Sequence, residues 1–91
     1  MRRKHELKTW PDSFRAILTG VKRYEVRPAD RGFEVDDLLW LREYIPEDAR
    51  YTGRAMMVRV SYMTPPGKFG VPEGLCVMGI VRVGRLRCGV V

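Results

Sequence analysis

The sequence predicts a small α+β protein, mostly β, in which about five strands form a curved β-barrel with one short helix packed on it. Its 91 residues are enough for one domain at most. Five segments have the alternation of strands, and one segment has helical spacing. Five strands are too many for a helical bundle and one helix is too few for a doubly wound sheet, so a small barrel uses them best. We expect a single domain over residues 1–81 and a loosely held basic tail over residues 82–91.

The predicted helix begins at Pro11, because proline is tolerated in the first turn, where its missing N–H costs nothing. Phe14, Ile17 and Leu18 follow at helical spacing and form a narrow apolar stripe. Gly20 is well placed to end the helix in the left-handed conformation. One short amphipathic helix is therefore expected in this segment.

The strand predictions include which side chains face the core. In the second strand, the period of 2 places Tyr24 and Val26 together in the core and the charged residues on the opposite face. In the third, the continuous apolar start predicts burial on both faces, with Trp40 and Tyr44 in the core. The five predicted strands are His5–Thr9, Arg23–Arg27, Leu38–Tyr44, Arg54–Met63 and Leu75–Val81.

The positive charge of the chain, formally +6, lies in excess at its two ends. Between His5 and Val81 the basic and acidic residues balance, so any basic surface on the body must come from clustering. Charge alone supports a nucleic-acid footprint and ordinary solvated surface charge about equally. The basic residues outside the balanced region are Arg2, Arg3, Lys4, Arg82, Arg85 and Arg87.

A membrane or secreted protein is not expected. The apolar runs fall far short of the roughly 20 residues that span a bilayer, and the start MRRKHEL lacks the apolar stretch of a signal peptide. We therefore expect the protein in the cytoplasm. Cys76 and Cys88 have neither metal-ligand spacing nor a secreted framework, so they are expected to be free thiols. His5 is the only histidine, and no metal or cofactor is expected.

The segment GVKRYEVR concentrates unlike charges between the helix and the second strand. Glu25 and Arg27 are two residues apart on one strand, so their side chains share a face, and Lys22 stands at the mouth of that strand. A guanidinium binds phosphate in a bidentate manner, a lysine adds charge, and a carboxylate accepts hydrogen bonds from exocyclic amines. The same three residues also suit a salt-bridge cluster that pins helix, turn and strand together, and spacing alone favours this structural role.

Four stretches of the chain also resemble a known family: HELKTWPDSFRAILTGVKRYEVR, DRGFEVDDLLWLREY, YTGR and FGVPEGLCVMGI. They are similar to the ASCH domains, the PUA-like group named after activating signal cointegrator-1 homology, and most of all to a short bacterial and phage subfamily of unknown function, DUF3850. The resemblance covers roughly residues 4–81. The ASCH signature Gly-x-Lys-x-x-Glu-x-Arg is filled by Gly20, Lys22, Glu25 and Arg27. Asp36 departs from the subfamily, which usually has glycine there.

The resemblance implies a PUA-like barrel with a cleft beside the signature strand, and RNA or a nucleotide as its ligand. With the signature added, Lys22, Glu25 and Arg27 are expected to form a ligand cleft. Lys8 is a further candidate from the first strand, with a plain surface lysine as the equal alternative. Trp10 is a candidate for stacking on a base, although packing against the first turn of the helix is the more common role of such a residue.

Two function classes follow, with binding ranked above catalysis. The first is an RNA- or nucleotide-binding module. The second is a small hydrolase acting on a modified nucleoside or on RNA, because some ASCH proteins are amidohydrolases of acetylated cytidine and others act as ribonucleases. In the amidohydrolases a threonine nucleophile stands at the position of Glu25, beside the lysine that matches Lys22, so their chemistry does not carry over directly. If the chain is an enzyme, Lys22 and Glu25 are the expected catalytic residues. A protein-interaction domain is a third, plainer interpretation.

Overall fold

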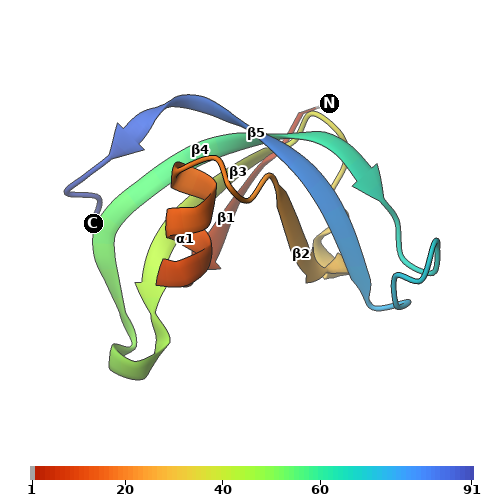
Figure 1. The fold of residues 1–91 in the computed structure, drawn as a ribbon, viewed down its shortest axis with the longest axis horizontal. Helices are drawn as coiled ribbons and strands as arrows, with labels where there is room; N and C mark the ends of the chain where they lie inside the picture. Colours follow the sequence, from red (N-terminus) through yellow and green to blue (C-terminus); the bar gives the residue numbers. More distant parts are fainter. Residues whose placement is uncertain (1) are drawn as a thin grey trace.

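A computed structural model describes residues 2–91 and confirms the predicted fold class: five strands in one curled sheet, with one α-helix packed on it (Figure 1). Two short 3-10 turns connect strands. The elements in chain order are β1 (Lys4–Thr9), α1 (Pro11–Leu18), β2 (Tyr24–Pro28), η1 (Ala29–Arg31), β3 (Leu38–Ile45), η2 (Pro46–Asp48), β4 (Arg50–Thr64) and β5 (Leu75–Arg87).

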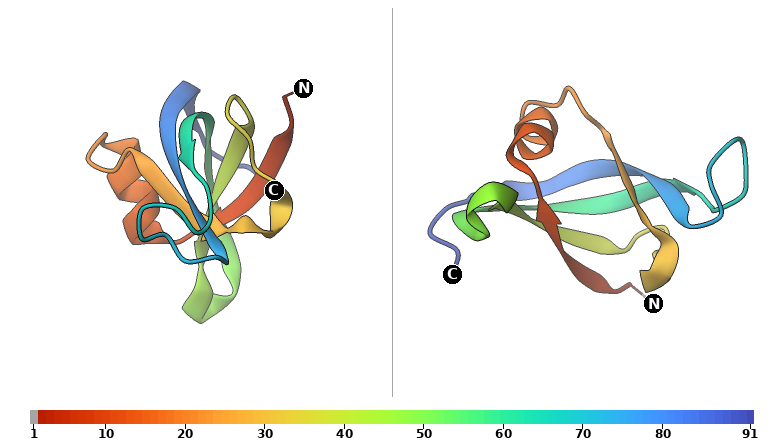
Figure 2. Two further views of the ribbon diagram at one scale, coloured as in Figure 1. Left: turned by 90° about the vertical axis from the view of Figure 1, so that its right-hand side faces the viewer. Right: turned by 90° about the horizontal axis from the view of Figure 1, so that it is seen from below.

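The sheet has the strand order β1-β3-β4-β5-β2, with β1 parallel to β3 and every other pair antiparallel. The register between the long strands β4 and β5 shifts twice, and such irregularities bend strands. The sheet therefore curls into a half-barrel, seen end-on in Figure 2, and its two edge strands approach each other. Side chains from the β2 side span the opening, because Arg27 Nη1 and Arg31 Nη1 each donate to a β1 carbonyl, those of Lys8 and Glu6, at 3.0 Å.

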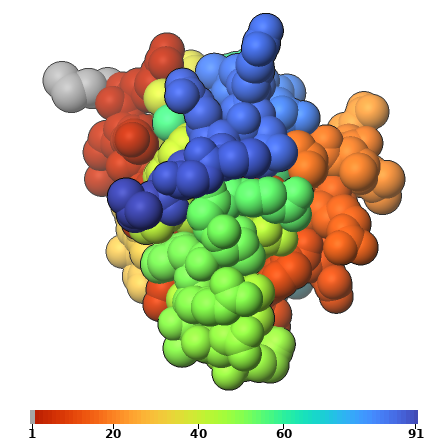
Figure 3. Space-filling view, turned by 90° about the vertical axis from the view of Figure 1, so that its left-hand side faces the viewer, coloured from red at the N-terminus to blue at the C-terminus, as the bar shows by residue number. Residues whose placement is uncertain are grey.

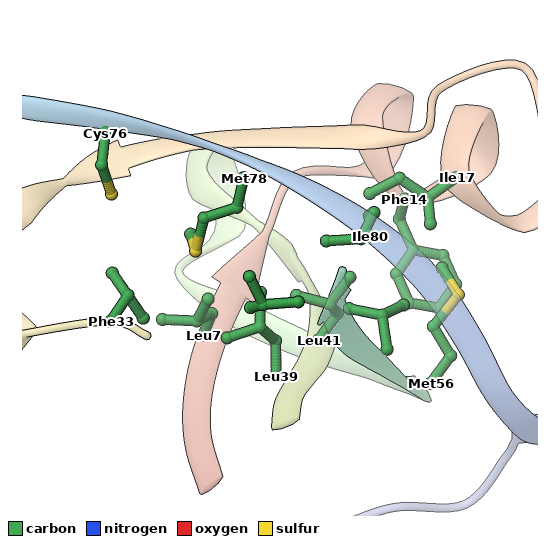
Figure 4. Close-up of a cluster of buried hydrophobic side chains, with 12 residues drawn as sticks. Leu7, Phe14, Ile17, Phe33, Leu39, Leu41, Met56, Cys76, Met78 and Ile80 are labelled. Carbon is green, nitrogen blue, oxygen red and sulfur yellow. The ribbon is translucent and has the colours of Figure 1, made fainter. Parts of the chain in front are cut away.

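The core fills the concave face of the sheet under α1. Phe14 and Ile17 point from the helix toward the strands, as Figure 4 shows, and Phe14 is fully buried. In β3 alternate side chains are buried, and Leu39 and Leu41 are the apolar ones among them. The prediction that Trp40 and Tyr44 lie in the core was wrong, because β3 buries alternate residues and these two lie on the other face, partly exposed.

The predicted orientation of β2 was also wrong. Tyr24 and Val26 are 49% and 46% exposed, whereas Glu25 is only 2% exposed and points inward. Period 2 correctly separates the two faces of a strand, but it does not decide which face is inside when a buried acid has charged partners. Lys22 and Arg27 supply those partners, so the carboxylate takes the core side.

The residues expected to form a loosely held tail, 82–91, largely continue β5. Arg82 is in register with Val58, and Arg87 with Ala55, so β5 remains paired with β4 up to Arg87. Beyond the strand, the Val90 N–H donates to the carbonyl of Gly53 at 2.8 Å. The first half of β4 pairs with β3 along one edge, and the end of the chain hydrogen-bonds to its other edge.

The predictions for Gly20 and for the two cysteines are confirmed, and Asp36 shows how the departure from glycine is accommodated. Gly20 has φ 82°, the left-handed conformation expected at the end of α1. Asp36 has φ 77°, so it adopts the conformation for which a glycine is usual, and its carboxylate accepts a hydrogen bond from Arg59 Nη1 at 3.0 Å. Cys76 is buried, Cys88 is exposed, and both are free. Among residues 2–91, no helix has the length and apolar character to cross a membrane.

Candidate functional site

The signature residues meet where α1 ends and β2 begins. The N–H of Gly20 donates to the carbonyl of Ile17 at 3.1 Å, and the N–H of Lys22 donates to the carbonyl of Ala16 at 2.9 Å. These bonds wrap the chain back over the last turn of the helix, as left-handed helix ends commonly do. The turn therefore sets Lys22 beside both the helix and the first residues of β2.

Glu25 is the centre of the cluster. Its carboxylate is held from both sides, because Lys22 Nζ lies 3.3 Å from Oε1 and Arg27 Nε lies 2.7 Å from Oε2. The shared face of Glu25 and Arg27 is as predicted. A buried carboxylate is costly unless its charge is paired and hydrogen-bonded, and here both oxygens are.

The two cations also reach other elements. Lys22 Nζ donates to Ser13 Oγ on α1 and lies 5.2 Å from the centre of the Tyr24 ring. Arg27 Nη1 donates to the carbonyl of Lys8, and its Nη2 donates to Thr9 Oγ1 at 3.3 Å. Each of the three guanidinium nitrogens of Arg27 therefore makes a hydrogen bond. Lys22 joins the turn to the helix, and Arg27 joins β2 to β1.

A hollow of about 240 Å³ opens beside Lys22. Its floor is apolar, with Ile17 and Ile80 among the side chains that line it. Its charged lining is entirely cationic and consists of Lys22, Arg23 and Arg82. Arg23 Nε and Arg82 Nη1 donate to the carbonyls of Gly20 and Leu18 at the C-terminal end of α1, where the helix dipole favours positive charge.

Lys8 contacts the Glu25 cluster through its backbone and not through its ammonium group. The Lys8 carbonyl accepts a hydrogen bond from Arg27, but its ammonium lies over the Tyr44 ring, 4.5 Å from the ring centre. A second hollow, of about 230 Å³, has Lys8, Arg27 and Arg31 in its lining. Lys8 therefore lies at the opening between β1 and β2 and makes no contact with Lys22 or Glu25.

Trp10 is 62% exposed and precedes the first turn of α1, where its carbonyl accepts the N–H of Phe14 at 2.8 Å. It lines a separate hollow of about 300 Å³ with Ser13 and Glu47. Ser13 thus lies between Trp10 and Lys22. The exposed indole is open to stacking, but it does not face the cationic hollow beside Lys22.

A second buried carboxylate was missed by sequence reasoning. Glu43 is 5% exposed, and Arg54 holds it in bidentate fashion, with Nε 2.9 Å from Oε1 and Nη2 3.1 Å from Oε2. Thr52 Oγ1 donates to Oε1 at 2.7 Å. The hydrogen bonds from Arg54 lower the pKa of Glu43, burial opposes them, and Thr52 and the charge of Arg15 add to the lowering. The signal was present, because Glu43 continues the buried phase of Leu39 and Leu41.

His5 has a structural role, as expected of a lone histidine on a strand. Its Nε2 lies 2.9 Å from Oδ2 of Asp37, and both side chains are buried. Asp37 also accepts the backbone N–H of Arg3 and of Glu34. Burial by itself raises the pKa of Asp37, but these hydrogen bonds and the nearby histidine outweigh it, so the pKa is lowered. The described residues, 2–91, contain no group of three or more His, Cys, Asp or Glu side chains placed to hold a metal ion.

These features define a small, mostly β protein whose half-barrel buries an acid between two cations. The chain matches DUF3850, a domain of unknown function, over residues 4–80, and it belongs to that family. It is also similar to the "Uncharacterized 12.9 kDa protein in GpA 3'region" of Escherichia phage P2, with 36% identity over 64 residues. The aligned part is 70% of this chain and 57% of the phage protein, so the chain spans a little over half of that relative.

Proposed function

We propose that this protein is an RNA- or nucleotide-binding module of the ASCH, PUA-like type. The observation that carries the proposal is the hollow beside Lys22, which combines an apolar floor with a rim of three cations, Lys22, Arg23 and Arg82. An apolar floor suits the face of a base, and cations on the rim suit phosphate oxygens. The filled signature and the curled half-barrel support the ASCH-type assignment.

The size of the hollow indicates how much ligand it holds. Drug-sized sites measure roughly 300–1,000 Å³, and this one, at about 240 Å³, lies just below that range. It therefore suits a single base or nucleoside with its phosphate at the rim. A longer RNA would place one nucleotide in the hollow and leave its neighbours outside.

The signature residues then have different tasks. Lys22 borders the hollow and contacts the ligand phosphate. Glu25 is buried behind Lys22 and holds the lysine in place. Arg27 positions Glu25 and closes the opening to β1. Lys8 and Trp10 flank the site at the strand opening and at the start of α1, where they extend contact to neighbouring nucleotides.

One contact favours the second candidate, a small hydrolase acting on a modified nucleoside or on RNA. Ser13 Oγ accepts a hydrogen bond from Lys22 Nζ, and a hydroxyl beside a lysine is an arrangement used for nucleophilic catalysis. A catalytic base must accept the proton of the nucleophile, however, and Lys22 is ion-paired with Glu25. Binding therefore ranks above catalysis.

Affinity measurements on matched variants test the binding site. Lys22→Met and Arg82→Gln are titrated with nucleoside monophosphates and with a short single-stranded RNA, and Lys68→Met, on the exposed loop after β4, is the control. Each lost phosphate contact should flatten the salt dependence of log affinity by about 0.7 for a single strand. The proposal fails if both site variants bind monophosphate like the control. Turnover of acetylated cytidine or RNA that is lost in Ser13→Ala would instead establish the hydrolase.

A further inference from the structure

Where β1, β3 and the start of β4 lie side by side, the face of the sheet that points away from the core carries three aromatic rings, each with a cation beside it. These rings, Trp40, Tyr44 and Tyr51, are called the outer aromatic face below. Tyr44 and Tyr51 also contact each other edge to face, with ring centres 5.0 Å apart. The three cation–ring pairs are Lys4 with Trp40 at 5.5 Å, Lys8 with Tyr44 at 4.5 Å and Arg42 with Tyr51 at 3.7 Å.

The pairs arise from strand register. In β3 the residues that alternate with the buried ones, among them Trp40 and Tyr44, lie on the outer face, and β1 is parallel to β3 and aligned with it. The exposed residues of β1 therefore stand beside them on the same face. The acid of β1 on this face, Glu6, is paired with Arg42 at 2.9 Å, so its charge is already matched.

The largest hollow described in this structure, about 600 Å³, adjoins the outer aromatic face at Trp40. Leu38 and Met57 line it with the indole, and Val83 and Val90 line it from β5 and the residues after it. Its charged lining contains three cations and no acid: Lys4, Arg85 and Arg87.

This hollow unites the two basic ends of the chain. Lys4 comes from the N-terminal group of cations, whereas Arg85 and Arg87 come from the C-terminal group. Figure 3 shows how the C-terminal residues (blue) lie across this side of the molecule. β5 pairs with β4 up to Arg87, and this pairing holds the C-terminal cations at the hollow lined by Trp40, which is called the groove below.

We propose that this groove binds single-stranded nucleic acid, with a base against Trp40 and the phosphates on Lys4, Arg85 and Arg87. A lining with cations and without acids favours an anionic partner. Aromatic rings interleaved with cations are the combination that binds single strands, because every base has a face that stacks. The groove shares no lining residue with the hollow beside Lys22, so this is a second surface that does not rest on the function proposed above.

In the free protein, a lysine occupies the ring face on which a base would stack. Lys4 is exposed and lies over the Trp40 ring, and such an exposed cation–ring contact is weaker than the stacking of a base on the same ring. A base displaces the ammonium, and the ammonium moves to the adjacent phosphate. Trp40 and Tyr44 are four residues apart on one strand, about 13 Å, so they contact different nucleotides.

The groove favours a single strand over a duplex. In a duplex the base faces are covered by their neighbours, and the rings of the outer aromatic face have no base to stack on. Phosphate contacts alone would then remain, and these are independent of strandedness. A preference for single strands thus distinguishes stacking from plain electrostatic attraction.

Two measurements on the full chain test the proposal. The first uses Trp10→Phe, which leaves Trp40 as the sole indole, and follows its fluorescence while a 12-nucleotide oligothymidylate is added. We expect quenching, and no quenching by the blunt duplex of the same length at equal concentration. The second compares the single-strand affinity of the double variant Arg85→Gln/Arg87→Gln with that of a control that loses the same charge elsewhere, Arg50→Gln/Lys68→Met.

The double variant should bind about tenfold more weakly or worse near 0.1 M salt, with a salt slope flatter by about 1.4, since two phosphate contacts are lost. The control should keep the wild-type affinity. Trp40 fluorescence that does not respond, or equal affinity of the double variant and its control, would overturn the proposal. So would a loss of single-strand binding in Lys22→Met that Arg85→Gln/Arg87→Gln does not share, because binding would then belong to the other hollow.

Discussion

Glu25 and Glu43 are both buried carboxylates on the inner face of the sheet, yet their partners are arranged in opposite ways. Arg54 gives two nitrogens to Glu43 from across the β3–β4 hairpin. The partners of Glu25 instead use their remaining donors on other elements, Lys22 on the helix and Arg27 on β1. Glu43 therefore links the two strands of one hairpin, β3 and β4. The Glu25 cluster instead connects β2 with α1 and β1. The Glu43 cluster thus only connects strands, whereas the Glu25 cluster also borders the hollow that we propose as a ligand site.

The largest expected effect is on Arg27, because within residues 2–91 it is the only side chain that links the Glu25 carboxylate to β1. Arg27→Met should destabilise the fold by about 3–5 kcal/mol, since it leaves a buried carboxylate with Lys22 alone and removes two contacts to β1. Urea unfolding measures the change. The control is Arg59→Met, whose partner Asp36 is exposed, with an expected loss of at most about 1 kcal/mol. Equal losses in the two variants would contradict the connecting role of Arg27.

The second effect concerns Glu43 and has a pH signature. Its pKa is lowered in the folded protein, so its contribution is present above the pKa of the unfolded chain and is lost as pH falls through the folded value. Glu43→Gln should cost about 1.5–3 kcal/mol at pH 7, the worth of hydrogen bonds to a charged group. In urea unfolding the difference from wild type should begin to shrink as pH falls below the unfolded-chain pKa of glutamate, about 4.3, and should vanish once the folded carboxylate is protonated as well.

A matched control for that experiment is Glu47→Gln, which alters an exposed acid in the turn that follows β3. It should leave stability nearly unchanged at every pH, as surface substitutions usually do. A stability difference between Glu43→Gln and wild type that is constant from pH 7 to pH 3 would show that the Arg54 pair does not stabilise the ionised form.

The comparison also shows what the sequence alone predicts. The elements follow from local patterns: the stripe from Phe14 to Leu18, the left-handed Gly20 and the alternation in each strand were enough to place them. The same alternation gave the shared face of Glu25 and Arg27. These features depend on neighbours within a few residues, so they are readable without the fold.

One error is local and the other concerns a contact between segments far apart in the chain. Residue hydrophobicity favoured Tyr24 and Val26 for the core, but Glu25 faces inward because Lys22 and Arg27, only a few residues away, pair its charge. The extension of β5 depends on the need of β4 for a neighbour, and that pairing in turn brings Arg85 and Arg87 to the groove with Lys4. No local pattern contains this information.

The smallest expected effect is that of Ser13→Ala, and a comparison with Thr52→Val separates the two clusters by their hydroxyl groups. Thr52 Oγ1 donates to the buried Glu43 and accepts the backbone N–H of Arg54, so Thr52→Val should cost about 1.5–3 kcal/mol. Ser13→Ala removes only the contact to Lys22, whose side chain is 23% exposed and can bind water instead, so the loss should stay below about 1 kcal/mol. Thermal and urea unfolding of both variants measures the contrast.

Ligand affinity adds a second comparison between the two variants. Ser13→Ala frees the lysine that borders the hollow and should change affinity, whereas Thr52→Val lies in the other cluster and should not. A larger stability loss in Ser13→Ala than in Thr52→Val would show that the helix contact of Lys22 is the structural one, and that the Glu25 cluster, too, serves mainly to hold the fold.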